Sequence, residues 1–129
     1  MARRRMIVPE IWQSESFAQL SILAKLVFIG LFSNADDERR GIANPVYIKS
    51  ILFPYDDGMR VIDIEKALSE IGQFMSVTLY THDGRKYYAL DNWKKSQTID
   101  RPKPSKLPPP TDEKSISDEL PKDRRQVDD

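Results

Sequence analysis

The strongest constraint on the fold is a change in apolar spacing close to residue 76. Before this point, apolar residues recur every three or four positions, which is the spacing of one face of an α-helix. After it, the segments "SVTLYT" and "KYYALDNW" alternate in polarity, and Asp83-Gly84 lies in the short turn between them. Because Asp-Gly suits a two-residue hairpin turn, the sequence predicts helices followed by a β-hairpin.

Three helices are predicted before the hairpin. The first follows the cap residue Ser21 and runs to about residue 35. The second follows the cap residue Asn44, has proline at its first position, and ends before Pro54. The third covers roughly 61–75 and begins without a Ser, Thr, Asn or Asp cap. The apolar residues expected to be buried include Leu23, Leu26, Val27, Leu31, Phe32, Ile48, Ile51, Leu52, Val61, Ile64, Leu68, Ile71 and Met75.

This order of elements predicts an α+β protein with a winged helix-turn-helix fold, made of three or four helices plus a β-hairpin wing. Residues 1–100 would form the winged-helix DNA-binding domain, 101–110 a Pro/Lys-rich strap, and 111–129 an acidic tail. The prolines predict that the strap leaves the domain in an extended form. The tail is poor in apolar residues, so we expect it to be disordered.

The formal net charge of zero hides an uneven distribution along the chain. From residue 85 to residue 107 there are seven basic and two acidic residues, whereas from 108 onward there are four basic and seven acidic ones. Basic clusters of this kind bind phosphates through release of counterions. The hairpin and the strap are therefore candidates for contact with nucleic acid, although a solubilising linker would also explain the strap.

Six segments together resemble a known family. They are "MARRRMI", "LSILAKLVFIGLFSNADDERRG", "ANPVYIKSILFPYDD", "IEKALSEI", "DGRKYYALDNW" and "SQTIDRPKPSKLPPP". From residue 1 to about 110 the chain resembles the N-terminal domain of phage replisome-organiser proteins, which initiate phage and prophage DNA replication and are related to the DnaD-type primosome family. The resemblance implies a winged-helix domain, binding to replication-origin DNA, and handover to helicase-loading proteins. Ser96 departs from the family pattern, which often has histidine there.

The candidate DNA-binding residues come from the N-terminus, the helices, the hairpin and the strap. On the third helix, Ser69 and Gln73 suit base edges, but neighbouring acids would repel phosphates. We therefore expect cations at the hairpin and the strap to supply most of the affinity for DNA. For each of these surfaces the alternative is an ordinary solvated surface without a ligand. Trp93 is expected to pin the end of the hairpin to the helices. The full set is Arg3, Arg4, Arg5, Lys49, Lys66, Ser69, Gln73, Arg85, Lys86, Lys94, Lys95, Arg101, Lys103 and Lys106.

Other classes of function are disfavoured by what the sequence lacks. It has no cysteine, only one histidine, and five scattered glycines without a phosphate-binding loop. We therefore expect no catalytic activity, no cofactor and no metal site. The apolar run "LSILAKLVFIGLF" is too short to cross a bilayer, so we expect no membrane association and a cytoplasmic location in a bacterial host cell.

The expected partners are origin-type duplex DNA, or single-stranded DNA, a second copy in a homo-oligomer, and a host helicase loader or helicase. Two alternative functions fit the same pattern. One is a protein-interaction module that binds a host replication protein or another host protein. The other is a winged-helix transcriptional repressor.

Overall fold

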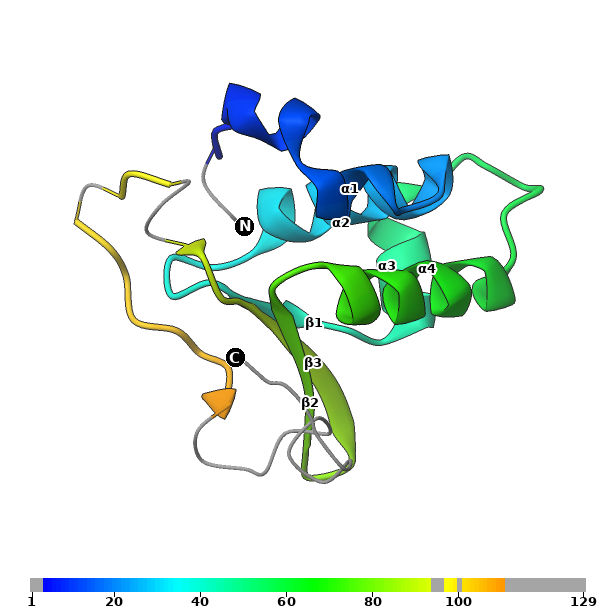
Figure 1. Cartoon of the computed structure of the whole chain (residues 1–129). Coiled ribbons are helices and arrows are strands. Elements are labelled where there is room, and N and C mark those ends of the chain that lie inside the picture. The colour runs from blue at the N-terminus through cyan, green and yellow to red at the C-terminus, as the bar shows by residue number, and fades with distance from the viewer. Residues whose placement is uncertain (1–3, 94–96, 100, 111–129) are drawn as a thin grey trace.

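The structure is a computed structural model that describes residues 4–93, 97–99 and 101–110. It confirms the predicted α+β class (Figure 1). The expected disorder of residues 111–129 lies outside the described residues. In chain order the elements are η1 (Pro9–Gln13), α1 (Glu15–Ala18), α2 (Ile22–Asn34), β1 (Arg40–Ile42), α3 (Pro45–Leu52), α4 (Val61–Phe74), β2 (Val77–His82) and β3 (Arg85–Leu90).

The three predicted helices begin where their local signals place them. The Ser21 hydroxyl accepts a 3.1 Å hydrogen bond from Ala24 N at the start of α2. At the start of α3, Asn44 Oδ1 accepts a 2.9 Å bond from Val46 N. These side chains satisfy backbone N–H groups that have no partner within the helix. The predicted boundaries of α2, α3 and α4 are confirmed to within a residue or two.

The predicted hairpin is confirmed and belongs to a three-stranded antiparallel sheet with strand order β1-β3-β2. Asp83 and Gly84 have φ angles of 51° and 77°, as a tight turn with two left-handed residues requires. Strand β1 was not predicted, because its three residues show too little alternation to be distinguished from a loop. Gly41 in β1 pairs with Tyr88 in β3. Figure 1 shows the hairpin extending away from the helices.

The core lies between the helices and the sheet. The largest fully buried side chains of this cluster are Ile48, Ile64, Ile71, Val27 and Tyr88, which come from α2, α3, α4 and β3. The Tyr88 hydroxyl donates a 2.6 Å hydrogen bond to the Leu31 carbonyl near the end of α2. This bond joins the sheet to the helical layer.

Two residues that were predicted to be buried are exposed. Leu26 on α2 is 53% exposed and Ile51 on α3 is 37% exposed. Helical spacing identifies the apolar side of a helix. How much of that side is buried depends on how the neighbouring elements pack against it. Within the described residues, no helix is both long enough and apolar enough to cross a membrane.

The prediction that the strap leaves the domain is wrong. Residues 101–110 run back alongside the sheet, as the yellow-to-orange segment of Figure 1 shows. The Tyr80 hydroxyl on β2 donates a 2.7 Å hydrogen bond to the Pro108 carbonyl. Prolines keep the segment extended, but an extended segment can still pack on a surface that offers the right partners.

Candidate nucleic-acid interface

One solvent-exposed stripe of α4 carries three of the predicted DNA-binding residues. Ile62, Lys66, Ser69 and Gln73 are all exposed, and their spacing of four, three and four places them on one side of the helix. Lys66 can bind a phosphate, while Ser69 and Gln73 offer hydrogen-bonding groups for base edges. The structure therefore presents these three side chains together on one face.

The three acids of α4 have different partners. Glu70 is half-buried and accepts hydrogen bonds of 2.8 Å from Ser21 N and 3.0 Å from the Ser21 hydroxyl. Asp63 is paired with the Arg60 guanidinium at 3.0 Å, and this side-chain hydrogen bond lowers the pKa of Asp63. Glu65, the third acid of α4, is exposed. Arg60 therefore offsets the charge of Asp63, whereas Glu65 and Glu70 keep negative charges that would repel phosphates.

The hairpin tip exposes two cations. Arg85 and Lys86 are both exposed, next to the left-handed residues Asp83 and Gly84. Because successive side chains of a strand point to opposite faces, Arg85 and Lys86 project from opposite sides of the hairpin. Cations at the end of a projecting hairpin suit contact with a phosphate backbone, which positions a protein without reading sequence.

The structure gives Arg5 an internal role in place of the predicted DNA contact. Its side chain is 1% exposed and forms a 2.9 Å ion pair with Asp37, which is 5% exposed. The guanidinium also donates to the Ala35 carbonyl at 2.8 Å and lies 4.9 Å from the centre of the Trp93 ring. Trp93 is 5% exposed and donates from Nε1 to the Asp37 carbonyl, so its predicted anchoring role is confirmed.

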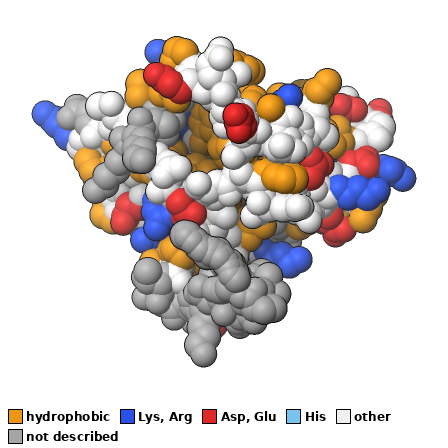
Figure 2. Space-filling view, in the orientation of Figure 1, with side chains coloured by type: hydrophobic (Ala, Val, Ile, Leu, Met, Phe, Trp, Pro, Cys, Tyr) orange, Lys and Arg blue, Asp and Glu red, His pale blue; other side chains and the backbone are white. Residues whose placement is uncertain are grey.

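The remaining predicted cations are spread over several surfaces. Arg4 is exposed in the N-terminal segment, and Lys49 is half-exposed on α3. Arg101, Lys103 and Lys106 are exposed along the strap. Arg3, Lys94 and Lys95 lie outside the described residues. Figure 2 shows basic and acidic side chains interspersed on the face in view.

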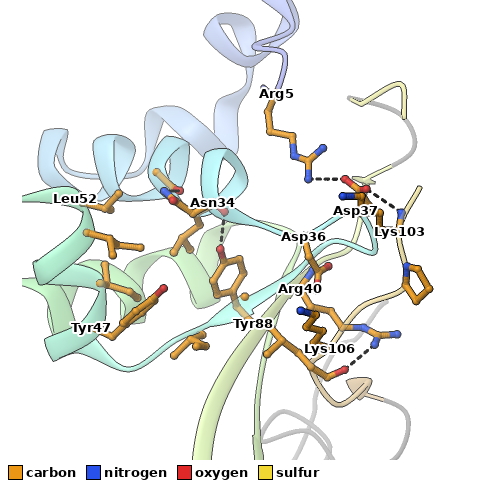
Figure 3. A pocket seen from close by; sticks show the side chains of 18 residues that line it. Arg5, Asn34, Asp36, Asp37, Arg40, Tyr47, Leu52, Tyr88, Lys103 and Lys106 are labelled. Carbon is orange, nitrogen blue, oxygen red and sulfur yellow. Dashed lines mark hydrogen bonds and ion pairs between the residues drawn. The ribbon is translucent and has the colours of Figure 1, made fainter. Parts of the chain in front are cut away.

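An acidic turn at residues 36–38 holds the first half of the strap. Lys103 N donates a 2.9 Å hydrogen bond to Asp37 Oδ2 (Figure 3). Ser105 N donates to the Glu38 carboxylate, and the Ser105 hydroxyl donates to Asp36. Sequence reasoning missed this contact, although the opposite charges of the turn and the strap were the available signal.

The outer face of the sheet holds the second half of the strap. Arg40 Nη1 donates a 2.9 Å hydrogen bond to the Leu107 carbonyl (Figure 3). The Leu107 side chain packs against an apolar cluster on the three strands, formed by Ile42, Tyr80, Tyr87 and Ala89. The strap is thus fixed by both polar and apolar contacts, while its lysine side chains remain exposed.

A cavity of about 590 Å³ lies between the strap and the helices. Figure 3 shows its wall, with Tyr88 and Asn34 on one side and Lys103 and Lys106 on the other. The acids that line it, Asp36 and Asp37, are engaged by the strap and by Arg5. The cavity therefore separates the docked strap from α2 and α3.

Comparisons with known proteins found no relative of this chain. The chain matches no protein-family model, no curated protein and no solved structure. In the described part of the chain, no group of three His, Asp or Glu side chains is placed to hold a metal ion. A function must therefore be inferred from the exposed residues and their geometry.

Proposed function

We propose that the chain is a winged-helix DNA-binding protein of phage or prophage replication initiation, a binding protein and not an enzyme. The observation that carries the proposal is the pair of exposed surfaces on α4 and on the hairpin tip. The first presents Lys66, Ser69 and Gln73, and the second presents Arg85 and Lys86. A helix that reads bases beside a hairpin that grips phosphates is the working arrangement of a winged helix-turn-helix domain.

The order of elements supports the fold part of the proposal. Helix α2 is followed by the short strand β1, by the helix pair α3 and α4, and then by the hairpin. Strand β1 pairs with β3, so the hairpin is tied to the helical layer. This arrangement is compatible with a winged helix in which α3 and α4 form the helix-turn-helix pair.

The assignment to replication rests on the resemblance to replisome-organiser proteins. Under this proposal the ligand is origin-type DNA in the cytoplasm of a bacterial host, and a host helicase loader or helicase is the downstream partner. Homo-oligomer formation would raise the affinity by linking weak contacts, because the second binding event becomes intramolecular. The exposed cations of the strap, Lys103 and Lys106, would add contacts to phosphates.

The proposal is tested by the salt dependence of DNA binding. Affinity of the full chain for a labelled duplex is measured by fluorescence anisotropy between about 50 and 200 mM salt. Replacing both Arg85 and Lys86 with Ala should lower the affinity and reduce the slope of log affinity against log salt by about 0.9 for each phosphate that the protein no longer neutralises. Lys66→Gln should have a smaller effect, and Lys25→Gln, a single-charge change beside Phe17, is the control.

One outcome would contradict the proposed DNA binding, and two others would change a part of the proposal. Absence of binding to duplex and to single strand at low salt would remove the DNA-binding role. A larger loss of affinity for Lys66→Gln than for the double hairpin variant would show that α4, and not the hairpin, supplies most of the affinity. Binding to a single palindromic operator in preference to iterated origin DNA would favour a repressor.

Exposed apolar residues favour a second candidate, a protein-interaction module. Ile22 is 84% exposed, Leu26 53% and Tyr55 95%. Contiguous apolar patches in contact with water are typical of surfaces that bind other proteins, and Ile22 and Leu26 lie one turn apart on α2. Strong binding of a host helicase loader without any DNA binding, lost on replacing Ile22 and Tyr55 with Ser, would favour this candidate.

A further inference from the structure

The contacts of residues 101–110 resemble those of a bound peptide more than those of an ordinary loop. We propose that the surface beneath them is a peptide-binding site that also takes residues 101–110 of a second copy, an extended, basic, proline-rich segment. We call this surface the strap site. It consists of Asp36, Asp37, Glu38, Arg40, Ile42, Tyr80, Tyr87 and Ala89. The inference does not depend on DNA binding.

The polar half of the strap site matches the backbone donors of the segment. Between residues 102 and 105 the sequence is Pro-Lys-Pro-Ser, so only Lys103 and Ser105 have a backbone N–H. Both of these groups donate to carboxylates, Lys103 to Asp37 and Ser105 to Glu38. The alternation of proline therefore leaves no backbone donor in this stretch without an acceptor.

The second half of the strap site matches the backbone carbonyls and the apolar side chain that the strap offers after Lys106. Prolines 108–110 have no N–H, so this stretch offers only carbonyls to a partner. Arg40 and Tyr80 donate to the carbonyls of Leu107 and Pro108 at 2.9 and 2.7 Å. The Leu107 side chain packs on the stacked rings of Tyr80 and Tyr87, whose centres are 5.6 Å apart.

Removal of the strap would take away the hydrogen-bond partner of a buried tyrosine. Tyr80 is fully buried, and its hydroxyl donates to the strap. Buried polar groups without a partner are destabilising, so loss of the strap must expose this hydroxyl to water or leave it unpaired. A segment with the same donors, acceptors and apolar anchor restores each of these interactions.

Residues 101–110 of a second copy are the occupant whose sequence fits the strap site. The three acids of the turn face a segment with three cations, Arg101, Lys103 and Lys106, so the charges are complementary. The first part of the strap is exposed and Leu107 is its main apolar anchor, so attachment within one chain is limited to a few contacts. The chain's own strap is favoured mainly by an effective concentration on the order of mM. Exchange between copies then links two domains without any new kind of contact.

The test uses two complementary variants of the full chain. The acceptor variant, Leu107→Asp, weakens its own strap and keeps the strap site intact. The donor variant, which supplies an intact strap, combines Arg40→Met with Tyr80→Phe. These changes remove the hydrogen bonds to the Leu107 and Pro108 carbonyls while keeping the packing of both side chains. The acceptor variant alone has a weakened strap, and the donor variant alone has a weakened strap site. An equimolar mixture contains an intact strap and an intact strap site on different chains.

The expected result is complementation in the mixture. Light scattering and native mass spectrometry should show a species of twice the chain mass in the mixture and only single chains in each separate variant. A labelled peptide of residues 101–110 should also bind the acceptor variant, and the same peptide with Leu107→Asp should bind at least about tenfold more weakly. The donor variant should bind neither peptide.

Two results would overturn the inference. One is a mixture that stays monomeric at a concentration where the labelled peptide would saturate the acceptor. The other is an acceptor variant that keeps the amide hydrogen-exchange protection of the core and fails to bind the peptide. Hydrogen exchange thus separates loss of the site from loss of the fold.

Discussion

Gly41 leaves room for the ring of Tyr88. A Cβ atom at position 41 would lie 2.2 Å from Cζ and from the hydroxyl oxygen of Tyr88. The two residues are directly paired across β1 and β3, and the Tyr88 hydroxyl donates to the Leu31 carbonyl on α2. The close approach of the β1 backbone thus allows a buried tyrosine to connect the sheet with the helices.

Gly41→Ala should destabilise the protein by about 1–3 kcal/mol, because the added methyl group forces the Tyr88 ring or the strand to move. Gly58→Ala is the matched control, since no atom lies within 4 Å of the position of the new Cβ. It should leave the free energy of unfolding unchanged or raise it by up to about 1 kcal/mol. Urea unfolding measures both. Equal stability of the two variants would show that the sheet adapts without cost.

Arg5 and Arg4 are adjacent arginines with different expected roles. Arg5→Met should cost about 3 kcal/mol of stability, because it removes a buried ion pair with the Asp37 carboxylate and the contact with Trp93. Arg5→Lys should not restore the full stability, because lysine lacks the planar fork of the guanidinium. Arg4→Met, at an exposed position, should change stability by less than about 0.5 kcal/mol. Thermal and urea unfolding compare the three; a fully stable Arg5→Met would contradict the internal role.

Glu70 and Glu65 provide a second matched pair, this time on α4. Glu70→Ala should cost about 1–2 kcal/mol, because Ser21 N and the Ser21 hydroxyl lose their acceptor at the start of α2. Glu65→Ala should leave stability within about 0.5 kcal/mol. Under the proposed function, it should also raise the affinity for DNA by removing a negative charge from the exposed face. Equal stability losses would show that the Glu70 contact has no special role.

Local signals in the sequence were enough to predict most of the elements. Ser21 and Asn44 cap the helices that follow them, and the two left-handed residues Asp83 and Gly84 form the hairpin turn. Each of these features depends on side chains and backbone groups within a few residues of one another. For this reason the pattern of the sequence contains the necessary information.

Features that depend on distant residues could not be predicted in the same way. The strap is held by Arg40, 67 residues before Leu107, and by Tyr80, 28 residues before Pro108. Arg5 belongs to a basic N-terminal run, but its burial depends on Asp37, 32 positions away. On the candidate interface, the sequence alone predicted that Lys66, Ser69 and Gln73 lie on one side of the helix. The hydrogen bond between Ser21 and Glu70 could not be predicted, because it depends on the packing of α4 against α2.

Stability should fall in alkaline solution because two tyrosines are buried. Burial raises the pKa of Tyr80 to about 12 and also raises that of Tyr88. An unfolded tyrosine loses its proton near pH 10, so above this pH the unfolded state binds fewer protons than the folded state. For Tyr80 the stabilisation is therefore complete below about pH 10 and is lost between about pH 10 and 12, at up to about 1.4 kcal/mol per pH unit. The contribution of Tyr88 changes with pH in the same direction. Urea unfolding from about pH 8 to 11 should show a shallower decline for Tyr80→Phe than for the wild type, with Tyr55→Phe, at a 95% exposed position, as control. An identical decline in all three would mean that the Tyr80 hydroxyl is not buried in solution.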